Sequence, residues 1–544
     1  MKLVSTEQMQ NLEKEANQNG LIIQKMMDNA GSGLATEIVL IAHSYNMLSA
    51  KVVGLVGSGN NGSDSLIAMS LLVEQGFLAT AYLINRNKKE DPFIIQFVKS
   101  GGKIVNLEDD GKFAYLHELI VSCDLLVDGI LGTGFKPPIK TETSMLLQNV
   151  NKILNERELR PVIIAVDCPS GVDNDSGEVS IGILSADYTI CMAAVKQGLL
   201  KLPAHEFTGK IRVVDIGFNK RNSSITEIKN QVADGQVIRS TLPIRQLDAH
   251  KGTFGTAIIV AGSINYSGAA LLAGKAAYRV GAGLVTLGVP APLQGILAGQ
   301  FPEATWLLLP HEMGVISASA APVIMENIDQ ATALLIGCGL GLEATTYEFM
   351  ELLLSSKFSS GRTSGKIGFL QKVEKISIRQ NYKIPPLVVD ADGLKLLTRI
   401  DHWTKKLPPN SILTPHPGEM EILTGIRKDE IQADRLNIAT RYAKEWEQIV
   451  VLKGAFTVIA SPDGRTTTIP VATPALARAG SGDVLAGMIV GFLAQGMDAY
   501  SSAISGAWFH AQAGLLAAER LGGSTSVIAG DLIDEIPYAI ALTS

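Results

Sequence analysis

The chain has few cysteines, and none of them belongs to a metal-binding or disulfide motif. Its 544 residues include 4 cysteines, Cys123, Cys168, Cys191 and Cys338, which lie far apart and form no CxxC pair. Zinc sites need closely spaced ligands, and disulfide frameworks need a denser set of cysteines. We therefore expect four buried thiols and a reducing compartment, the cytoplasm.

Long apolar runs and an excess of basic charge are also missing. No stretch reaches the roughly 18 uninterrupted apolar residues of a membrane span, and the segment MKLVSTEQMQNLEKEANQNG is polar and acidic. The 47 basic and 53 acidic residues are well mixed and give a net charge of −6. This distribution leaves no basic stripe that could follow a phosphate backbone. We expect neither a membrane nor a nucleic acid as partner.

What the sequence does have is a recurring order of short β-branched runs that end in Gly, Asp or Asn, each followed by a helical pattern. This order is typical of parallel sheets joined by crossover helices, and the length exceeds what one core usually organises. We predict two different α/β domains with a boundary near residue 225. The clearest strands are expected within 51–61, 123–134, 160–171, 210–218, 255–263, 331–341, 385–393 and 447–456. The segment 221–243 looks like a linker or a domain-swapping connector, and 342–386 looks like a surface excursion without an assigned function.

A glycine-rich turn in RAGSGDVLAG, residues 478–487, leads directly into an apolar helical pattern. The unpaired N–H groups and the positive dipole end of a helix N-terminus attract phosphate, and glycines let a ligand approach the backbone. Asp483 at the start of this helix is placed to act as a base. The alternative is that Gly480, Gly482 and Asp483 only form a turn and a helix N-cap.

Two aspartates follow a predicted buried strand in VVDADGL, residues 388–394. Ligands of open α/β sheets bind beyond the carboxyl ends of the strands, which is where these side chains lie. Because Asp390 and Asp392 alternate across the strand end, one should face the cleft and the other should cap the next helix. We favour Asp392 as the residue that faces the cleft.

Two further motifs of the second half also follow predicted strands. TPHPGEME, residues 414–421, holds His416 between two prolines and so on a rigid loop. KGAFT, residues 453–457, places Lys453 beyond the sheet edge, where a nucleotide phosphate or ribose could lie. The alternative for KGAFT is a simple strand-to-turn connection with a solvated lysine.

Taken together, these motifs resemble one known family. HKGTFGTAIIVAGSINYSGAA, GCGLG, VVDADGL, LTPHPGEM, KGAFT and AGSGDVLAG occur in the order found in the ribokinase-like ADP- or ATP-dependent NAD(P)H-hydrate dehydratases. The resemblance spans roughly residues 240–540 and implies a ribokinase-like α/β domain over 226–544. In that family a nucleotide phosphorylates the hydroxyl at carbon 6 of the hydrated nicotinamide ring, and phosphate then leaves to regenerate NAD(P)H. The resemblance implies Mg²⁺ for the phosphoryl step and favours ADP over ATP.

The resemblance also implies roles for individual residues of this half. Asp483 would be the catalytic base. The hydrate would be bound by Ala269, Gly339 and His416. The nucleotide would be bound by Lys453, Gly454, Ala455, Phe456, Thr457 and Gly482. Ala479 stands where the family often has a glycine, but the anion-binding residues 480–483 remain, so we expect little harm.

In the first half, GSGNNGSDS at residues 57–65 follows a predicted strand and opens a helix without being a GxGxxG motif. Its asparagines offer side-chain carbonyls and amides that suit an alkali cation or a polar ring substituent as well as phosphate. The alternative is an Asn-Gly turn with a helix cap. Asp128 and Asp167 end two further predicted strands, in VDGILGTG and VDCPSGVD. Three polar strand ends favour a pocket at this edge of the sheet.

These motifs, together with VSTEQMQNLEKEA and MMDNAG, resemble the NAD(P)H-hydrate epimerase family over about residues 1–220. That family commonly precedes the dehydratase domain in one bacterial chain. The resemblance implies a Rossmann-like three-layer α/β domain over 1–225, with Asp167 as the acid/base residue. The substrate would be bound by Asn60, Asn61, Gly62, Ser63, Asp64, Gly132, Thr133, Gly134, Phe135, Lys136, Pro137 and Pro138. A potassium ion would be bound by Asn61, Asp128 and Ser170, whose oxygen atoms suit a hard cation.

One departure from the epimerase pattern is the sequence NNGSDS in place of the usual NNGGDG. Ser63 adds a Cβ where the family's glycine would allow a positive φ or close ligand contact, at a cost of about 1 kcal/mol. We predict a bifunctional enzyme that epimerises the R and S hydrates of NADH and NADPH and dehydrates the S form, and the resemblance implies a homo-oligomer. Two alternatives remain open: a ribokinase-like vitamin or sugar kinase, which would release a phosphorylated product, and a first domain that has become a binding or scaffold module.

Overall fold

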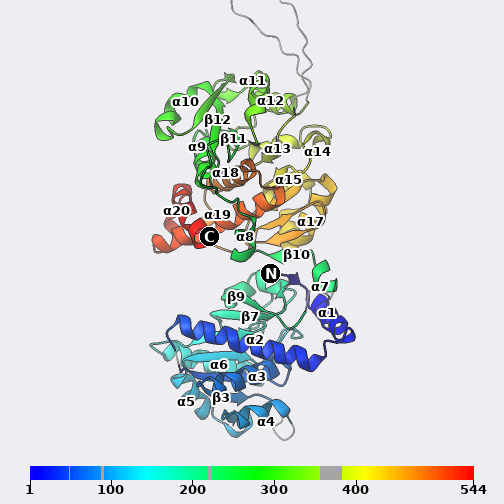
Figure 1. Ribbon diagram of the computed structural model, residues 1–544, viewed down its shortest axis with the longest axis vertical. Helices are drawn as coiled ribbons and strands as arrows, with labels where there is room; N and C mark the ends of the chain where they lie inside the picture. The colour runs from blue at the N-terminus through cyan, green and yellow to red at the C-terminus, as the bar shows by residue number, and fades with distance from the viewer. Residues whose placement is uncertain (48, 87–90, 219–222, 356–382, 544) are drawn as a thin grey trace, which may run out of the picture. The chain divides into compact units, whose positions relative to one another are not determined.

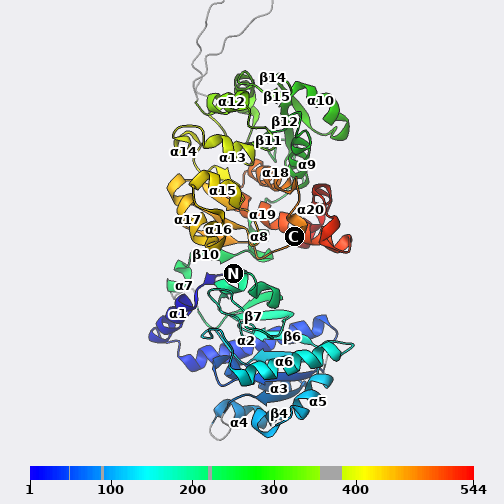
Figure 2. The same cartoon turned by 180° about the vertical axis from the view of Figure 1, so that it is seen from behind.

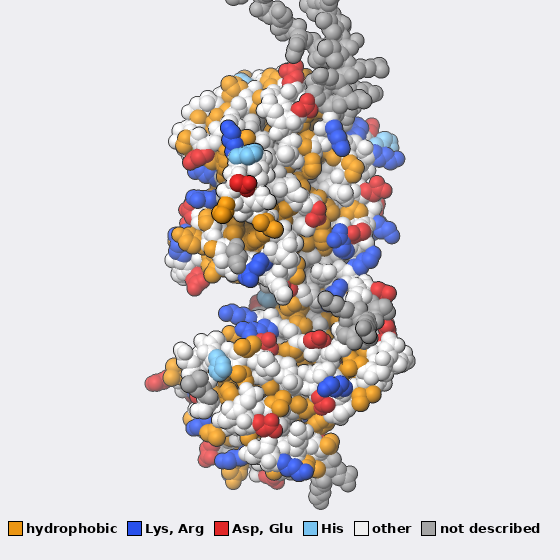
Figure 3. All heavy atoms as spheres, in the orientation of Figure 1, with side chains coloured by type: hydrophobic (Ala, Val, Ile, Leu, Met, Phe, Trp, Pro, Cys, Tyr) orange, Lys and Arg blue, Asp and Glu red, His pale blue; other side chains and the backbone are white. Residues whose placement is uncertain are grey.

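The computed structural model describes residues 1–47, 49–86, 91–218, 223–355 and 383–543. These residues form two compact units, Met1–Val232 and Ala233–Ser544. Each unit is an α/β structure with helices against both faces of a central sheet (Figure 1, Figure 2). Basic and acidic side chains are intermingled on the face of each unit that Figure 3 shows.

The first unit is built on a parallel sheet of seven strands in the order β4-β3-β2-β5-β6-β7-β9. The central strands are buried on both faces, which explains why the sequence there is continuously apolar and does not alternate. The strands are β2 (Lys51–Val56), β3 (Leu78–Leu83), β4 (Lys103–Asn106), β5 (Leu125–Gly129), β6 (Val162–Val166), β7 (Tyr188–Met192) and β9 (Lys210–Val214).

Two apolar cores lie on opposite faces of this sheet. One core is shared with α2 (Ile23–Ser44), α3 (Asn60–Glu74) and α4 (Pro92–Lys99). The other core is shared with α5 (Ala114–Ser122) and α6 (Thr141–Glu156). The expected three-layer α/β arrangement of the first unit is therefore confirmed.

The N-terminal segment of the chain forms a small sheet of its own. Strand β1 (Leu3–Val4) pairs in parallel with β8 (Val195–Lys196), so that Val4 lies opposite Lys196. Helix α1 (Thr6–Gln18) begins directly after β1, and Ser5 and Gln8 form a capping box at its start. This pairing fixes α1 beside the strand that carries Lys196.

The second unit has a sheet in the order β21-β20-β19-β18-β17-β16-β11-β12-β13. Strands from β19 to β13 pair in parallel, whereas β20 and β21 are antiparallel. The strands are β11 (Thr256–Val260), β12 (Leu284–Pro290), β13 (Thr305–Leu309), β16 (Ala333–Ile336), β17 (Leu387–Val389), β18 (Ile412–Leu413), β19 (Ile449–Leu452), β20 (Val458–Ala460) and β21 (Thr466–Thr468); β14 (His311–Glu312) and β15 (Val315–Ile316) form a separate hairpin.

Helices again cover both faces of this sheet. One core is shared with α9 (Gly268–Arg279), α10 (Ala291–Leu297), α18 (Ser481–Ala494), α19 (Ala499–Arg520) and α20 (Ala529–Thr543). The other core is shared with α11 (Ala320–Asn327), α12 (Ala344–Leu354), α13 (Asp392–Leu397), α15 (Pro417–Thr424), α16 (Lys428–Ala433) and α17 (Arg435–Trp446), with α14 (Trp403–Lys406) packed beside it.

The segment 221–243, expected to be a linker or a domain-swapping connector, contains the division between the two units, and its described part has secondary structure. It contains α7 (Ser223–Glu227), β10 (Asn230–Val232) and α8 (Gly235–Thr241), and Asp234 caps α8 by accepting a hydrogen bond from Val237 N at 2.9 Å. Of the expected excursion at 342–386, residues 344–354 form α12, and 356–382 lie outside the described residues. The four cysteines are free and buried, as expected. Among the described residues, no helix combines the length and the apolar character that a membrane crossing requires.

Candidate active sites

The glycine-rich turn at 478–487 forms the start of α18, as the sequence predicts. Gly480 is the N-cap and has φ 84°, a left-handed conformation that side chains rarely adopt. The turn and the N-cap of the alternative interpretation are thus present, and no side-chain hydrogen bond caps this helix among the described residues. Ser481 N donates to Arg478 O at 3.2 Å, whereas the N–H groups of Gly482 and Asp483 have no partner among the described residues and could bind an anion, which the helix dipole also favours.

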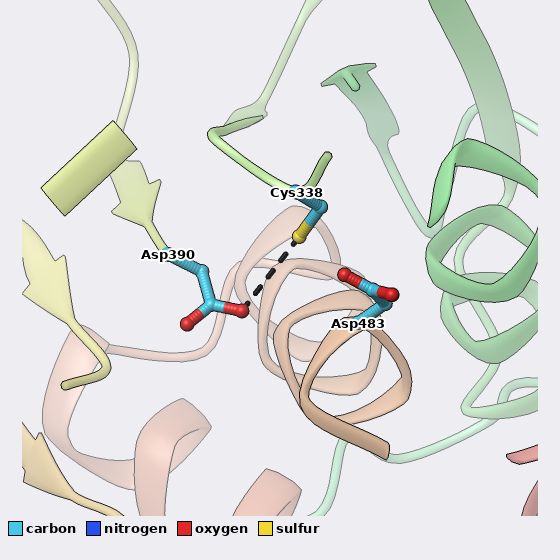
Figure 4. A group of neighbouring side chains, drawn as sticks. All are labelled: Cys338, Asp390 and Asp483. Atoms are coloured by element: carbon cyan, nitrogen blue, oxygen red, sulfur yellow. Dashed lines mark hydrogen bonds between the residues drawn. The ribbon is translucent and has the colours of Figure 1, made fainter. Parts of the chain in front are cut away.

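Asp483 projects from the first turn of α18 towards Asp390 and Cys338 (Figure 4). The nearest oxygen and sulfur atoms of these three side chains lie within 4.8 Å of one another. Burial and the Asp390 carboxylate raise the pKa of Asp483 to about 6. Near neutral pH this side chain is therefore ionised, yet it accepts a proton more readily than an ordinary aspartate does.

Asp390 is the hub of the polar contacts in this site. Its Oδ1 accepts hydrogen bonds from Thr414 Oγ1 and from Lys453 Nζ, both at 2.6 Å, and its Oδ2 accepts one from Cys338 Sγ at 3.7 Å. Lys453 Nζ also lies 3.8 Å from Glu419 Oε2. Burial alone would lower the pKa of Lys453, but the two carboxylates outweigh it and raise this pKa. The alternative of a solvated lysine in KGAFT is therefore wrong.

The preference for Asp392 over Asp390 as the residue facing the site is also wrong. Asp390 is 1% exposed and points at Asp483, whereas Asp392 begins α13, accepts a hydrogen bond from Gly341 N at 3.1 Å and pairs with Lys395 at 3.1 Å. Neither aspartate caps the helix, because the N-cap of α13 is Ala391, which has φ 52°. Its positive φ turns the chain between the two aspartates, which simple alternation along a strand does not anticipate.

His416 is the N-cap residue of α15 and is held rigidly, as the flanking prolines predict. Its Nδ1 accepts hydrogen bonds from Gly418 N at 3.0 Å and Glu419 N at 3.2 Å. The Glu419 carboxylate accepts one in return from His416 N at 2.9 Å. Burial lowers the pKa of His416. The cap leaves Nε2, 3.3 Å from Glu419 Oε1, as the remaining polar atom of the ring.

Gly339 and Ala269, both expected to contact the hydrate, are brought together. Gly339 has φ 62°, and a Cβ on it would lie 2.9 Å from Ala269 Cβ and 2.8 Å from Tyr266 Cβ. Only glycine fits at this point. Tyr266, which is 58% exposed beside this contact, was missed by sequence reasoning.

The residues expected to bind the nucleotide form a closed turn next to α18. Thr457 Oγ1 donates to Gly454 O at 2.9 Å and accepts from Gly454 N at 3.3 Å. A Cβ on Gly482 would lie 3.5 Å from Lys453 Nζ, so the start of α18 lies beside this ammonium group. Sequence analysis did not identify Arg435, whose Nη2 donates to Leu452 O at 2.7 Å directly before the turn.

A buried histidine, also missed from the sequence, supports the start of α18. His510 Nε2 lies 2.9 Å from Ser481 Oγ, and burial lowers the pKa of His510 to about 4. The ring is therefore neutral at physiological pH. A weak signal for it was available, because α19 is apolar around His510 and buried histidines need a polar partner.

In the first unit, the predicted cation ligands surround the backbone of Leu131. Asn61 Nδ2 donates to Leu131 O at 3.2 Å, and Leu131 N donates to Ser170 Oγ at 2.9 Å. Asp128 accepts hydrogen bonds from Ser170 Oγ at 2.5 Å and from Ser170 N at 2.9 Å. Burial outweighs these hydrogen bonds and raises the pKa of Asp128. No ion pair of Asp128 is found within the described residues.

Asp167 ends β6 with φ 66° and is buried. Its Oδ1 accepts a hydrogen bond from Met192 N at 2.9 Å and forms an ion pair with Lys196 Nζ. Lys196 is also buried and donates to Met192 O at 3.1 Å. The sequence identified Asp167 but gave no signal for Lys196.

The strain expected at Ser63 is absent, because Ser63 lies within α3 and has an ordinary helical conformation. Its Oγ accepts a hydrogen bond from Arg86 Nη2 at 2.9 Å. Ser65 Oγ donates to Asn61 O at 2.7 Å. The residue that cannot carry a side chain is Gly62, where a Cβ would lie 2.0 Å from Gly57 O.

The loop 132–138 is only partly joined to this site. A Cβ on Gly132 would lie 2.6 Å from Asn61 Oδ1, so Gly132 packs directly on the asparagine. Lys136 instead pairs with Asp173 at 3.0 Å and with Asp175 at 3.4 Å, and its side chain is 60% exposed. The structure therefore does not bring its ammonium group to Asp167.

Comparison with known proteins gives matches over almost the whole chain. A family model described as NAD(P)H-hydrate dehydratase matches residues 257–360 and 367–538, and one described as YjeF-related protein N-terminus matches 23–198. The bifunctional NAD(P)H-hydrate repair enzyme Nnr of Moorella thermoacetica is 34% identical over 99% of this chain and 97% of the relative. That of Thermofilum pendens is 31% identical over 99% and 96%. A solved ADP/ATP-dependent NAD(P)H-hydrate dehydratase from Bacillus subtilis, co-crystallised with ATP/Mg²⁺, is 28% identical with TM-score 0.44, over 58% of this chain and 99% of that chain.

Proposed function

Because the chain belongs to the family of bifunctional NAD(P)H-hydrate repair enzymes, we propose that its two units divide the two reactions of that family between them. The protein interconverts the R and S forms of hydrated NADH and NADPH, and it dehydrates the S form to NAD(P)H with ADP or ATP. We assign the epimerase to residues 1–225 and the dehydratase to residues 226–544.

Asp483 is the proposed base of the dehydratase, because it combines a raised pKa with a place at a helix N-terminus. Its carboxylate accepts the proton of the C6 hydroxyl while that oxygen attacks the terminal phosphorus of the nucleotide, and the bond to the leaving nucleoside phosphate breaks. The C6–O bond then breaks with its electron pair on phosphate, assisted by the lone pair of the ring nitrogen. Loss of a proton from the adjacent ring carbon restores the double bond of NAD(P)H.

The remaining residues of the second unit position the two substrates. The start of α18 and the Lys453 ammonium beside Gly482 provide positive charge for the transferred phosphoryl group. We propose that the nucleotide is bound by Lys453, Gly454, Ala455, Phe456, Thr457 and Gly482. We propose that the hydrate is bound by Ala269, Gly339, His416 and Asp483. Of the two nucleotides, ADP is the proposed preferred donor.

Cys338, Asp390 and Asp483 do not fit Mg²⁺ as a three-residue site. A thiol is a soft ligand, and Lys453 and Thr414 already occupy Asp390 Oδ1. Mg²⁺ usually keeps several waters and binds through substrate phosphates. We therefore propose that Mg²⁺ enters with the nucleotide.

For the first unit we propose Asp167 as the acid/base residue of the epimerase. The substrate-binding residues are Asn60, Asn61, Gly62, Ser63, Asp64, Gly132, Thr133, Gly134, Phe135, Lys136, Pro137 and Pro138. We propose Asn61, Asp128 and Ser170 as the potassium ligands, because Asn61 and Ser170 both contact the Leu131 backbone, Ser170 bonds to the buried Asp128 carboxylate, and all three carry oxygen atoms that suit a hard cation. When bound, the ion would neutralise Asp128 and hold the Leu131 loop against α3.

Two separate assays on the full chain test this division of labour. Asp483→Asn should lower dehydration of pure S hydrate by at least about 100-fold while leaving R-to-S interconversion intact. Asp167→Asn should have the reverse effect. Loss of both activities in either variant would contradict the assignment. We further propose that the protein is a homo-oligomer, which light scattering of the purified protein tests. We also propose that it is located in the cytoplasm, where NADH and NADPH turn over.

A further inference from the structure

The first unit contains a second buried carboxyl group close to the Asp167–Lys196 ion pair. Asp64 lies in the first turns of α3 and is 6% exposed. Its Oδ1 is fully buried and has no hydrogen-bond partner among the described residues. Buried polar atoms are nearly always satisfied, so an unpartnered carboxyl oxygen in a binding site points to a ligand group that completes it.

The hydrogen bonds of α3 place Asp64 at the end of β6. Asn61 Nδ2 donates to Val166 O at 2.5 Å, and Val166 directly precedes Asp167. Asn61 and Asp64 are three residues apart, so they lie on the same face of the helix. Asp64 therefore faces the strand end that carries Asp167. On the other side of this turn, the Arg86 guanidinium contacts Ser63 and pairs with Asp91 at 2.7 Å, so it is already occupied.

Helix α1 adds a third carboxylate to the same cluster. The pairing of β1 with β8 sets Val4 opposite Lys196, and α1 follows directly. Glu13 lies one turn after the buried Met9, on the inner side of α1. Burial raises the pKa of Glu13, with Lys196 opposing and Asp167 adding to the effect.

The cluster holds three carboxyl groups and one ammonium group, so ionisation of all three carboxyl groups would leave two negative charges without a positive partner. Lys196 is the ammonium group among the four, and its ion pair is with Asp167. Burial raises the pKa of Asp64 well above its ordinary value, and the Asp167 and Glu13 charges add to this while Lys196 opposes it. Asp64 therefore holds its proton more tightly than an ordinary aspartate does, and it faces the strand end that carries the Asp167 carboxylate.

We propose that Asp64 is the general acid of the epimerisation and Asp167 its general base, with Lys196 and Glu13 as positioning residues. This inference rests on the proposed epimerase function of the first unit. Asp64 thereby takes a chemical step in addition to substrate binding, and Glu13 and Lys196, to which the sequence assigned no role, hold it and Asp167 in place.

The step balances with these groups alone. The Asp64 carboxyl group gives its proton to the C6 hydroxyl oxygen, and the C6–O bond breaks with its electron pair on the departing water. The ring nitrogen's lone pair forms a C6=N iminium bond. Water then attacks the opposite face of C6, its electron pair forms the new C6–O bond, the iminium electrons return to nitrogen, and Asp167 takes the proton. The state with the proton on Asp167 catalyses the reverse conversion, or it resets by exchange with solvent.

Isosteric replacement of Asp64 in the full chain tests the proposal. Asp64→Asn should lower the rate constant of R-to-S conversion at saturating substrate by about 100-fold or more. Dehydration of S hydrate by the same sample should be unchanged, which shows that the protein is intact. Asp110→Asn is the matched control: Asp110 is also buried in the first unit, but it is hydrogen-bonded to Tyr82 at 3.2 Å, and its replacement should leave epimerisation unchanged.

The pH profile tests the positioning residues. Wild-type epimerisation should fall at high pH, as Asp64 loses its proton. Glu13→Gln removes a like charge and should move this basic limb to lower pH. Lys196→Met removes the cationic partner of Asp167 and should move the acidic limb to higher pH. A purely structural role would change the rate without moving either limb.

Infrared spectroscopy provides a second readout that does not depend on activity. The wild-type protein near neutral pH should show a protonated carboxyl band that Asp64→Asn removes. Absence of that band would overturn the proposal. So would epimerisation by Asp64→Asn at the rate of the Asp110→Asn control, if Asp167→Asn is inactive in the same assay. If the wild-type chain itself does not interconvert the R and S hydrates, the proposed epimerase function fails, and this inference fails with it.

Discussion

Replacing Asp483 by asparagine should abolish dehydration and, at the same time, stabilise the second unit. Burial and the Asp390 charge raise the pKa of Asp483 to about 6 in the folded protein. The folded state therefore binds this proton more tightly than the unfolded chain does. Ionisation of Asp483 opposes folding, and stability is lost as pH rises from about 4 through about 6. Asparagine has nearly the same shape and no charge to bury.

The size of the effect follows from the pKa difference. The pKa of Asp483 rises from the ordinary value of 3.8 to about 6, a difference of roughly 2 pH units. Each unit of pKa difference corresponds to about 1.4 kcal/mol in the free energy of unfolding. Asp483→Asn should therefore raise the free energy of unfolding by about 3 kcal/mol near pH 8 and by close to zero near pH 4. The structure thus predicts that the base is retained for function at the expense of stability.

Denaturant titration followed by tryptophan fluorescence measures this effect in the full chain. All four tryptophans, Trp306, Trp403, Trp446 and Trp508, belong to the second unit. Asp392→Asn is the matched control, because Asp392 accepts a backbone hydrogen bond and pairs with a lysine, so its replacement should destabilise. A loss of stability in Asp483→Asn near pH 8, or a gain that is equal at both pH values, would refute the reasoning.

Three further results are expected. Asp390→Asn should move the acidic limb of kcat/KM for dehydration to lower pH, because the Asp390 charge raises the pKa of Asp483; an unmoved limb would contradict the cluster in Figure 4. Lys453→Met should raise the KM for the nucleotide about tenfold or more, since it removes an ammonium group beside the start of α18; unchanged KM values would place the phosphates elsewhere. Ser65→Gly should weaken hydrogen-exchange protection of α3 by about 1–2 kcal/mol, because it removes a hydrogen bond and adds a helical glycine; equal protection would show that Ser65 contributes nothing.

The fold and the starts of both site helices could be predicted because their signals are local. Glycine-rich turns mark the N-termini of α3 and α18, and both helices begin there. The β-branched runs form the expected strands of both sheets. These features depend on neighbouring residues only, which a single sequence contains.

The contacts across the sheet could not be predicted in the same way. Cys338 meets Asp390 because β16 and β17 are paired so that Ile336 lies opposite Val389. Lys453 follows β19, which lies two strands from β17 in the sheet, and from there it reaches Asp390. Such contacts depend on strand order and register, which no local pattern encodes. The choice between Asp390 and Asp392 failed for a related reason, since the positive φ of Ala391 breaks the alternation.

The departure at Ser63 shows the limit of reasoning from a family motif. The glycine that the family usually has there suggested a special backbone conformation, but the position is an ordinary turn of α3. Close packing instead requires a glycine at Gly62, where a Cβ would lie 2.0 Å from Gly57 O, and the chain retains it. Lys196 lies outside every motif, and nothing local in VSTEQMQNLEKEA places its Glu13 near Asp167; the pairing of β1 with β8 brings the α1 segment there.

The most direct test of the central claim is recovery of reduced-nicotinamide absorbance from a mixture of R and S NADH hydrates by the wild-type chain, with Mg²⁺, K⁺ and ADP or ATP. Two activities in one chain predict recovery of the whole mixture at a rate faster than spontaneous interconversion allows. Recovery of the S fraction alone would contradict an active epimerase in the first unit. No recovery with either nucleotide would contradict the dehydratase.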